Sequence, residues 1–429
     1  MRKAILFLIL ALSGRTILHA DPITERVLTS GIRVVLKPES GTKRVAISLF
    51  IRTPKTQSVQ EAVVSQMVAH ALFYSGTEWV GGYTALVVAQ VGGTLETVVT
   101  PDYVSLSLVT YRSQLGDAVN LLCEAVRHAD FSTYALHEAF LDIERSKDQR
   151  TQMPFQAAEQ KVFNALSTTP SPSRSSLLSV DHSMAEAYYI SHYTPDRIVV
   201  SVVGGFNPDT VVSDFDAYLY DFNRASAGPI TAKSQSAPTV SHSTNAVLTI
   251  PGKICYALVG IQSPEVESPN YPAFLVLQSL LGVGHASRMF IQLRDKQPLG
   301  YQVGITWSPE MDTPAIAALQ WSTASLPGDR LTSLDSTVAS VLTQPPTSEE
   351  LDRAIAVECT TEMALQQRVR EEAYLLGWYE VMGVGWGFQK TLIADMKAVT
   401  KSDLMRVASQ YLPHRYDLLA IPKEVKPNK

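Results

Sequence analysis

The sequence predicts an α+β protein built from two homologous α/β sandwich domains. Three observations predict this fold: a length of 429 residues, strands interleaved with long helices, and one order of elements that occurs twice. That length corresponds to about three average domains or two large ones. Because 45% of the residues are hydrophobic and only 18% are charged, the chain can bury a large core and is not a disordered protein.

The first copy is predicted to contain a hairpin, a strand, a helix, a strand pair, three more helical segments and a closing strand. Alternating apolar residues mark its strands, as in RVAISLFIR, and helical spacing of apolar residues marks its helices. The expected limits are, in chain order, 25–37, 44–52, 59–74, 94–100 with 103–111, 114–128, 133–166, 184–192 and 198–203.

The second copy repeats this order without the opening hairpin. Its expected limits are 254–262, 272–281, 301–307 with 315–322, 330–342, 348–382, 402–411 and 417–421. The offset between corresponding elements is nearly constant, which indicates an internal duplication. Residues 223–245 are rich in Ser, Ala, Thr and Pro and are predicted to be a linker. The domains are therefore expected at 21–222 and 246–429.

The first 20 residues are predicted to be a signal peptide. Arg2 and Lys3 precede a short apolar run, AILFLILAL, and cleavage is expected near Ala20. Such a run is too short to cross a bilayer core of about 30 Å. No later segment is long and apolar enough to be an integral membrane segment. The mature chain is therefore expected to be exported, to a bacterial periplasm.

Composition and missing motifs exclude several functions. The net charge of −5, without a basic run, argues against nucleic-acid binding. Three cysteines lie far apart, which excludes a zinc ribbon and a disulfide framework and favours buried free thiols over a single disulfide. The sequence contains no GxxxxGK phosphate loop and no GxSxG serine-hydrolase motif.

One helix carries a candidate site, the segment QMVAHALFYSGT that begins at Gln66. Gln66 and His70 are four residues apart and so share a helix face. Two histidines at this spacing, with a glutamate, could hold Zn²⁺ and activate water. Only one of these groups is present, so physical reasoning alone favours a packed or capped helix histidine at position 70.

Four segments together resemble the pitrilysin/insulinase family of zinc metallopeptidases, in its two-domain, processing-peptidase-like branch. They are QMVAHALFYSGT, VGGTLETVVTPDYVSLSLV, HYTPDRIVVSVVGGF and ASRMFIQLRDKQPLGYQV. The resemblance covers nearly the whole mature chain and agrees with the internal duplication. It implies two pitrilysin-type sandwich domains, and pairing of two subunits to close a four-domain chamber around peptide substrates.

The metal motif departs from the family pattern. Gln66 stands where the resemblance places the first histidine ligand, and Ala69 where it places the general-base glutamate, so His70 alone remains. The third ligand, a glutamate, would fall near residues 143–148, where Glu144 is close but out of register. A catalytic Zn²⁺ normally has three protein ligands and a water. The chain is therefore expected to bind no zinc and to lack peptidase activity alone.

A second signature is complete. The resemblance implies that Arg294 and Tyr301 reach a substrate bound at the zinc of a facing domain, where both can donate to a carbonyl. The alternative is that Arg294 pairs with a neighbouring acid and Tyr301 packs on the core. The resemblance also implies that the strand carrying Thr94, Leu95, Glu96 and Thr97 binds peptides by strand addition; an ordinary sheet edge is the alternative.

Three hypotheses follow. The first is an exported subunit without its own zinc, which completes the chamber of a zinc-bearing sister subunit as a heterodimer, or pairs with itself, and supplies Arg294 and Tyr301 to peptide cleavage. The second is a non-catalytic structural or binding homologue. The third is a self-sufficient zinc metallopeptidase with an atypical site at His70.

Overall fold

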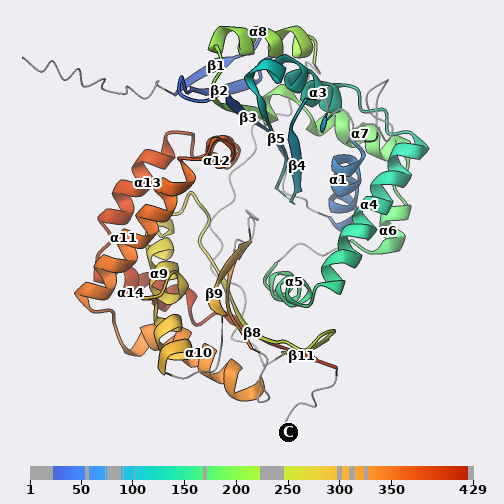
Figure 1. The fold of residues 1–429 in the computed structure, drawn as a ribbon. Coiled ribbons are helices and arrows are strands. Elements are labelled where there is room, and N and C mark those ends of the chain that lie inside the picture. Colours follow the sequence, from blue (N-terminus) through green and yellow to red (C-terminus); the bar gives the residue numbers. More distant parts are fainter. Residues whose placement is uncertain are drawn as a thin grey trace, which may run out of the picture.

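The computed structural model describes the chain over residues 23–53, 58–72, 74, 88–89, 91–100, 102–167, 172–222, 246–296, 302–308, 315–322 and 327–423. These residues form two mixed sheets with helices packed against them, which confirms the predicted fold class (Figure 1). We call residues 23–222 the first half and 246–423 the second half. The predicted signal peptide and linker lie outside the described residues, and the predicted domain limits stay predictions.

The first sheet has six strands in the order β1-β2-β6-β3-β5-β4. Strands β2 and β6 run parallel, and the other neighbours are antiparallel. The strands are β1 (Thr24–Val27), β2 (Arg33–Pro38), β3 (Arg44–Arg52), β4 (Thr94–Val99), β5 (Tyr103–Tyr111) and β6 (Ile198–Gly204). The helices of this half are α1 (Val59–Ala71), α3 (Leu115–Arg127), α4 (Thr133–Gln152), α5 (Pro154–Leu166), α6 (Arg174–Leu178), α7 (His182–His192) and α8 (Pro208–Leu219).

The second sheet has five strands in the order β7-β11-β8-β10-β9. They are β7 (Ala246–Ile250), β8 (Cys255–Gln262), β9 (Gln302–Ser308), β10 (Ala315–Ser322) and β11 (Arg415–Pro422). The helices are α9 (Tyr271–Gly282), the π-helix η3 (Phe290–Lys296), α10 (Pro327–Thr343), α11 (Ser348–Leu365), α12 (Val369–Val381), α13 (Phe388–Lys397) and α14 (Lys401–Tyr411).

The sequence analysis was wrong about two long helices. Each stretch predicted as one helix contains two helices. The stretch 133–166 breaks at Met153, which is extended before Pro154, and Pro154 starts α5. A residue before proline disfavours helical backbone, whereas proline fits the first helical position. The stretch 348–382 breaks before α12, where Arg368 is extended. The sequence interpretation also missed α6, α8, α13 and β7.

After each break, the helix that follows packs on the sheet of the other half (Figure 1). Helix α5 packs on β8, β10 and β11, and α12 packs on β3 and β6. Strand β3 shows the consequence: Val45, Ile47 and Leu49 join the core under the first half's own helices, whereas Ala46 joins a cluster with Leu376 of α12. Both faces of this strand are buried because side chains alternate between them.

Two ion pairs hold α12 along β2. Arg33 contacts Glu380 at 2.5 Å, and Lys37 contacts Glu372 at 2.8 Å. Eight residues of helix span about 12 Å and four residues of strand about 13 Å, so both pairs form in register. The Glu372 and Glu380 side chains are 2% and 6% exposed, and a buried carboxylate needs such partners. Gln389 donates a further bond to Glu372 at 2.8 Å.

Glycines allow each exchanged helix to approach its sheet closely. A Cβ at Gly377 of α12 would lie 2.5 Å from the Phe50 ring and 2.7 Å from Ser201 Oγ. A Cβ at Gly260 of β8 would lie 2.3 Å from Val162 of α5. Both contacts are shorter than packed atoms tolerate, so the exchange depends on glycine at both positions.

We expect Gly377→Ala to lower the free energy of unfolding by up to about 2 kcal/mol. Overpacking against the fully buried Phe50 typically costs about 1–3 kcal/mol, and alanine's better helix propensity offsets about 1 kcal/mol of that cost. Gly387→Ala is the matched control, because nothing lies within 4 Å of its Cβ. Chemical denaturation measures both; equal stability of the two variants would contradict close packing of α12 on the sheet.

Helix α11 buries unpartnered polar groups on three successive turns. Glu358 Oε2, Glu362 Oε2 and Gln366 Nε2 are buried and have no hydrogen-bond partner within the described parts of the chain. Burial raises the pKa of Glu358 to about 8, helped by the charge of Glu362, and burial raises the pKa of Glu362 to about 7. Tyr271 of α9 lies close enough to feel both charges. The folded chain therefore keeps protons here that the unfolded chain loses near the ordinary glutamate pKa of 4.5.

We expect the free energy of unfolding to fall as the pH rises from about 4.5 to about 8. In this window the folded state binds more protons than the unfolded state, so rising pH favours unfolding. Replacing both residues, Glu358→Gln with Glu362→Gln, should flatten the decline. Glu349→Gln, on the exposed face of α11, should not. Denaturation curves across this pH range measure the slope; the same slope in the double variant and in the wild type would disprove this assignment.

Candidate functional site

His70 lies in the last turn of α1 and faces α4. Its Nδ1 lies 2.9 Å from Oδ2 of Asp142, a geometry in which the imidazole N–H donates to the carboxylate. This hydrogen bond lowers the pKa of Asp142 below its ordinary value. The His70 side chain is 15% exposed. His70 is therefore a packed and hydrogen-bonded helix histidine, the arrangement that physical reasoning from the sequence favoured.

The other two positions of the motif offer little to a metal ion. Gln66 contributes a neutral amide, whose buried Oε1 has no hydrogen-bond partner in the described structure. Ala69 is fully buried and contributes only a methyl group. Nowhere in the described ranges do three His, Cys, Asp or Glu side chains come together as a metal site. These residues do not fit a catalytic Zn²⁺, which requires three protein ligands and a nearby base.

The helix expected to carry the third ligand is α4, which packs on α1. Glu144, the nearest candidate in the sequence, points to Lys147 at 3.6 Å and Arg174 at 3.4 Å. The acid that meets His70 is Asp142, which sequence analysis missed. Asp142 lies one residue before the range 143–148 in which the third ligand was expected, so a range wider by one residue would have included it.

Strand β4 is an edge of the first sheet. One side of it pairs with β5, and the other side has no strand partner among the described residues. Thr94, Glu96 and Thr97 are exposed and Leu95 is partly buried. Glu96 forms an ion pair with Arg370 of α12, so the second half contributes a charge beside this strand. As far as the described residues extend, β4 thus has the unpaired edge that peptide addition requires.

Arg294 lies on η3 with its side chain exposed. Its guanidinium carbon is 4.8 Å from the centre of the Phe290 ring, within the range of a cation–π contact. The Phe290 ring therefore packs against the guanidinium of Arg294. Tyr301, the other member of the predicted pair, lies outside the described residues.

Two kinds of sequence similarity bear on this arrangement. Residues 179–357 match a family model described as the peptidase M16 inactive domain. An uncharacterized zinc protease of Bacillus subtilis is 21% identical over 336 residues, which cover 76% of this chain and 80% of the relative. An uncharacterized zinc protease of Mycobacterium leprae is 22% identical over 326 residues, 71% of this chain and 70% of the relative.

Residues 179–357 therefore carry a domain of the M16 peptidase type, and most of the chain is similar to two zinc proteases. Solved structures agree in fold. A protease from Helicobacter pylori has a TM-score of 0.82 at 17% identity and covers 94% of this chain and 99% of its own. An M16 inactive-domain protein from Pseudomonas fluorescens has a TM-score of 0.79 at 16% identity and covers 95% of this chain and 100% of its own. The chain thus has an M16-like fold, while Gln66 and Ala69 depart from the metal motif.

We expect the purified chain to bind well under one zinc per molecule, because Gln66 and Ala69 replace a ligand and the base. Elemental analysis after dialysis measures this. A chelator should leave the thermal unfolding midpoint unchanged, whereas His70→Ala should lower it by removing the bond to Asp142. A full equivalent of zinc that disappears in His70→Ala would contradict this expectation.

Proposed function

We propose that this chain is an exported pitrilysin-like peptidase subunit that completes the chamber of a zinc-bearing sister subunit. The observation that carries the proposal is an asymmetry within one chain. Gln66 and Ala69 cannot act as a histidine ligand and a general base. The fold of a protease nevertheless covers 94% of the chain, and Arg294 is exposed. Folding alone gives no reason for Arg294 and Tyr301 to stand together in the family signature while the metal motif is incomplete.

The two halves would contribute different parts of a peptide-binding chamber. The free edge of β4 offers main-chain hydrogen bonds to an extended peptide, with Thr94 and Glu96 beside it. Arg294 offers guanidinium donors that can stabilise negative charge on a substrate carbonyl, and Tyr301 would add a phenol. The sister subunit would supply the zinc, which polarises the carbonyl and activates water.

The partner is proposed to be a separate chain with an intact metal motif, so the assembly would be a heterodimer. A homodimer of this chain would lack zinc at both sites, given Gln66 and His70. Export to the periplasm is part of the proposal, on the basis of the basic, then apolar, first 20 residues. None of the described helices combines the length and the apolar character needed to cross a bilayer.

A structural or binding role without any part in catalysis is the second candidate. The similarity of residues 179–357 to a domain described as inactive favours it. The two candidates differ in what Arg294 and Tyr301 do: in a scaffold, neither side chain would affect turnover by the partner.

The test is reconstitution with a zinc-bearing M16 homologue from the same organism. Peptide cleavage should require both chains, and Arg294→Ala or Tyr301→Phe should each lower kcat by about 10²–10³, the usual cost of losing one such donor. Subunit association, measured by analytical ultracentrifugation, should stay the same.

Arg353→Ala is the matched control, because it removes an exposed arginine that pairs with Glu349 on α11. It should leave kcat unchanged, and Arg294→Lys should restore part of the loss. If both signature variants keep turnover within about twofold, roughly 0.4 kcal/mol, the scaffold role is correct and the catalytic one is not.

A further inference from the structure

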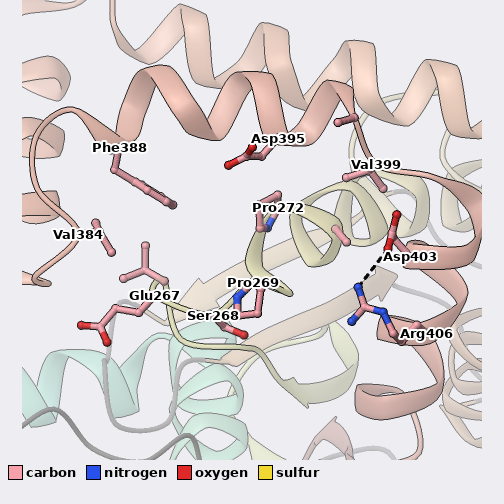
Figure 2. Close-up of a pocket in the computed structure, with 13 residues that line it drawn as sticks. Glu267, Ser268, Pro269, Pro272, Val384, Phe388, Asp395, Val399, Asp403 and Arg406 are labelled. Carbon is pink, nitrogen blue, oxygen red and sulfur yellow. Dashed lines mark hydrogen bonds and ion pairs between the residues drawn. The ribbon is translucent and has the colours of Figure 1, made fainter.

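A hollow of about 470 Å³ lies on the second half, between the loop that follows β8, the start of α9, and helices α13 and α14 (Figure 2). Its size falls within the range of about 300–1,000 Å³ that is typical of ligand pockets. Its lining includes no residue of α1, β4 or η3, so it is distinct from the candidate functional site. Any role it has is independent of the proposed peptidase role.

The floor of this hollow is apolar. Val266 and Ala273 are each 4% exposed, and Phe388 of α13 closes one side. Pro269 and Pro272 form part of the wall, and the proline ring fixes the backbone there. The surface is thus preformed for an aliphatic group.

Two of the charged lining groups already satisfy each other. Arg406 donates to Asp403 at 3.2 Å and also to Asn270. Asp403 also accepts hydrogen bonds from Thr400, which caps α14. This pair stabilises the start of α14 and α9 and leaves little charge for a ligand.

The carboxylate of Asp395 differs from these paired groups in its position and its partners. Figure 2 shows its carboxylate directed into the hollow from α13, whereas the carboxylate of Glu267 points away from the centre. Within the described residues, Asp395 has no hydrogen bond or ion pair to its carboxylate, while Glu267 acts electrostatically on Arg52 of the first half. The hollow therefore presents the exposed carboxylate of Asp395, without a protein partner in the described structure, above an apolar floor.

We propose that this hollow binds a lysine side chain carried by an extended segment of a partner protein. A lysine combines an aliphatic stem, which can lie on Val266 and Ala273, with a single ammonium that can reach Asp395. An arginine could also bind the Asp395 carboxylate through two of its five N–H donors, but the apolar floor has no acceptor for the remaining donors. A free diamine would bring a second ammonium, for which the apolar floor has no acceptor.

The test is a methyl NMR titration of the full chain with the peptide acetyl-Ala-Lys-Ala-amide. We expect saturable shifts of Ala273, Val384 and Val399, which line the hollow. The same peptide with norleucine, which keeps the stem and lacks the ammonium, should bind at least about threefold more weakly. Asp395→Asn should weaken lysine-peptide binding by about threefold to fivefold, the scale of one exposed ion pair.

Glu267→Gln is the matched control, because it removes a lining charge that points away, and it should change affinity by less than about twofold. The proposal is overturned if the lysine peptide shifts none of these methyl groups, or if norleucine binds equally well. It is also overturned if Asp395→Asn has no effect. Stronger binding by 1,5-diaminopentane than by the peptide would identify a free diamine site in place of a protein contact.

Discussion

The exchange of one helix between the halves is the constraint on which the rest of the structure depends. Each sheet is covered on one face by its own helices and on the other by a helix of the opposite half, α12 on the first sheet and α5 on the second. Every central strand is therefore buried on both faces. The exchange also brings Arg370 beside β4, so residues of both halves lie along this sheet edge.

The candidate site shows how a fold can outlast its chemistry. In place of a metal, a hydrogen bond between His70 and Asp142 joins α1 to α4. This hydrogen bond links the two helices on which the resemblance places the metal ligands. Both helices begin with capped N-termini, at Ser58 and Ser132, and need no ligand to form.

Much of the fold follows from local patterns in the sequence. Alternation identified β3, a short run of apolar residues identified β6, and the repeated order of elements identified the second half. The sheets on which α5 and α12 pack could not be predicted, because the local sequence of a helix does not determine which sheet it contacts. The resemblance placed Gln66, Ala69 and His70 on one helix. The contact of Asp142 with His70 could be recognised only from the packing of α1 on α4. Arg294 was found from its motif, whereas its contact with Phe290 was not.

The exchange has a consequence for synthesis. Helix α5 leaves the ribosome long before β8 and β11, so the apolar side that carries Val162 and Leu166 has no sheet to cover until the second half has been made. The first sheet likewise waits for α12 to cover Ala46 and Val203. Neither half can complete its core alone, and the nascent chain exposes apolar surface until nearly the last strand is made. A chaperone that shields this surface would act on the first half before the second is complete.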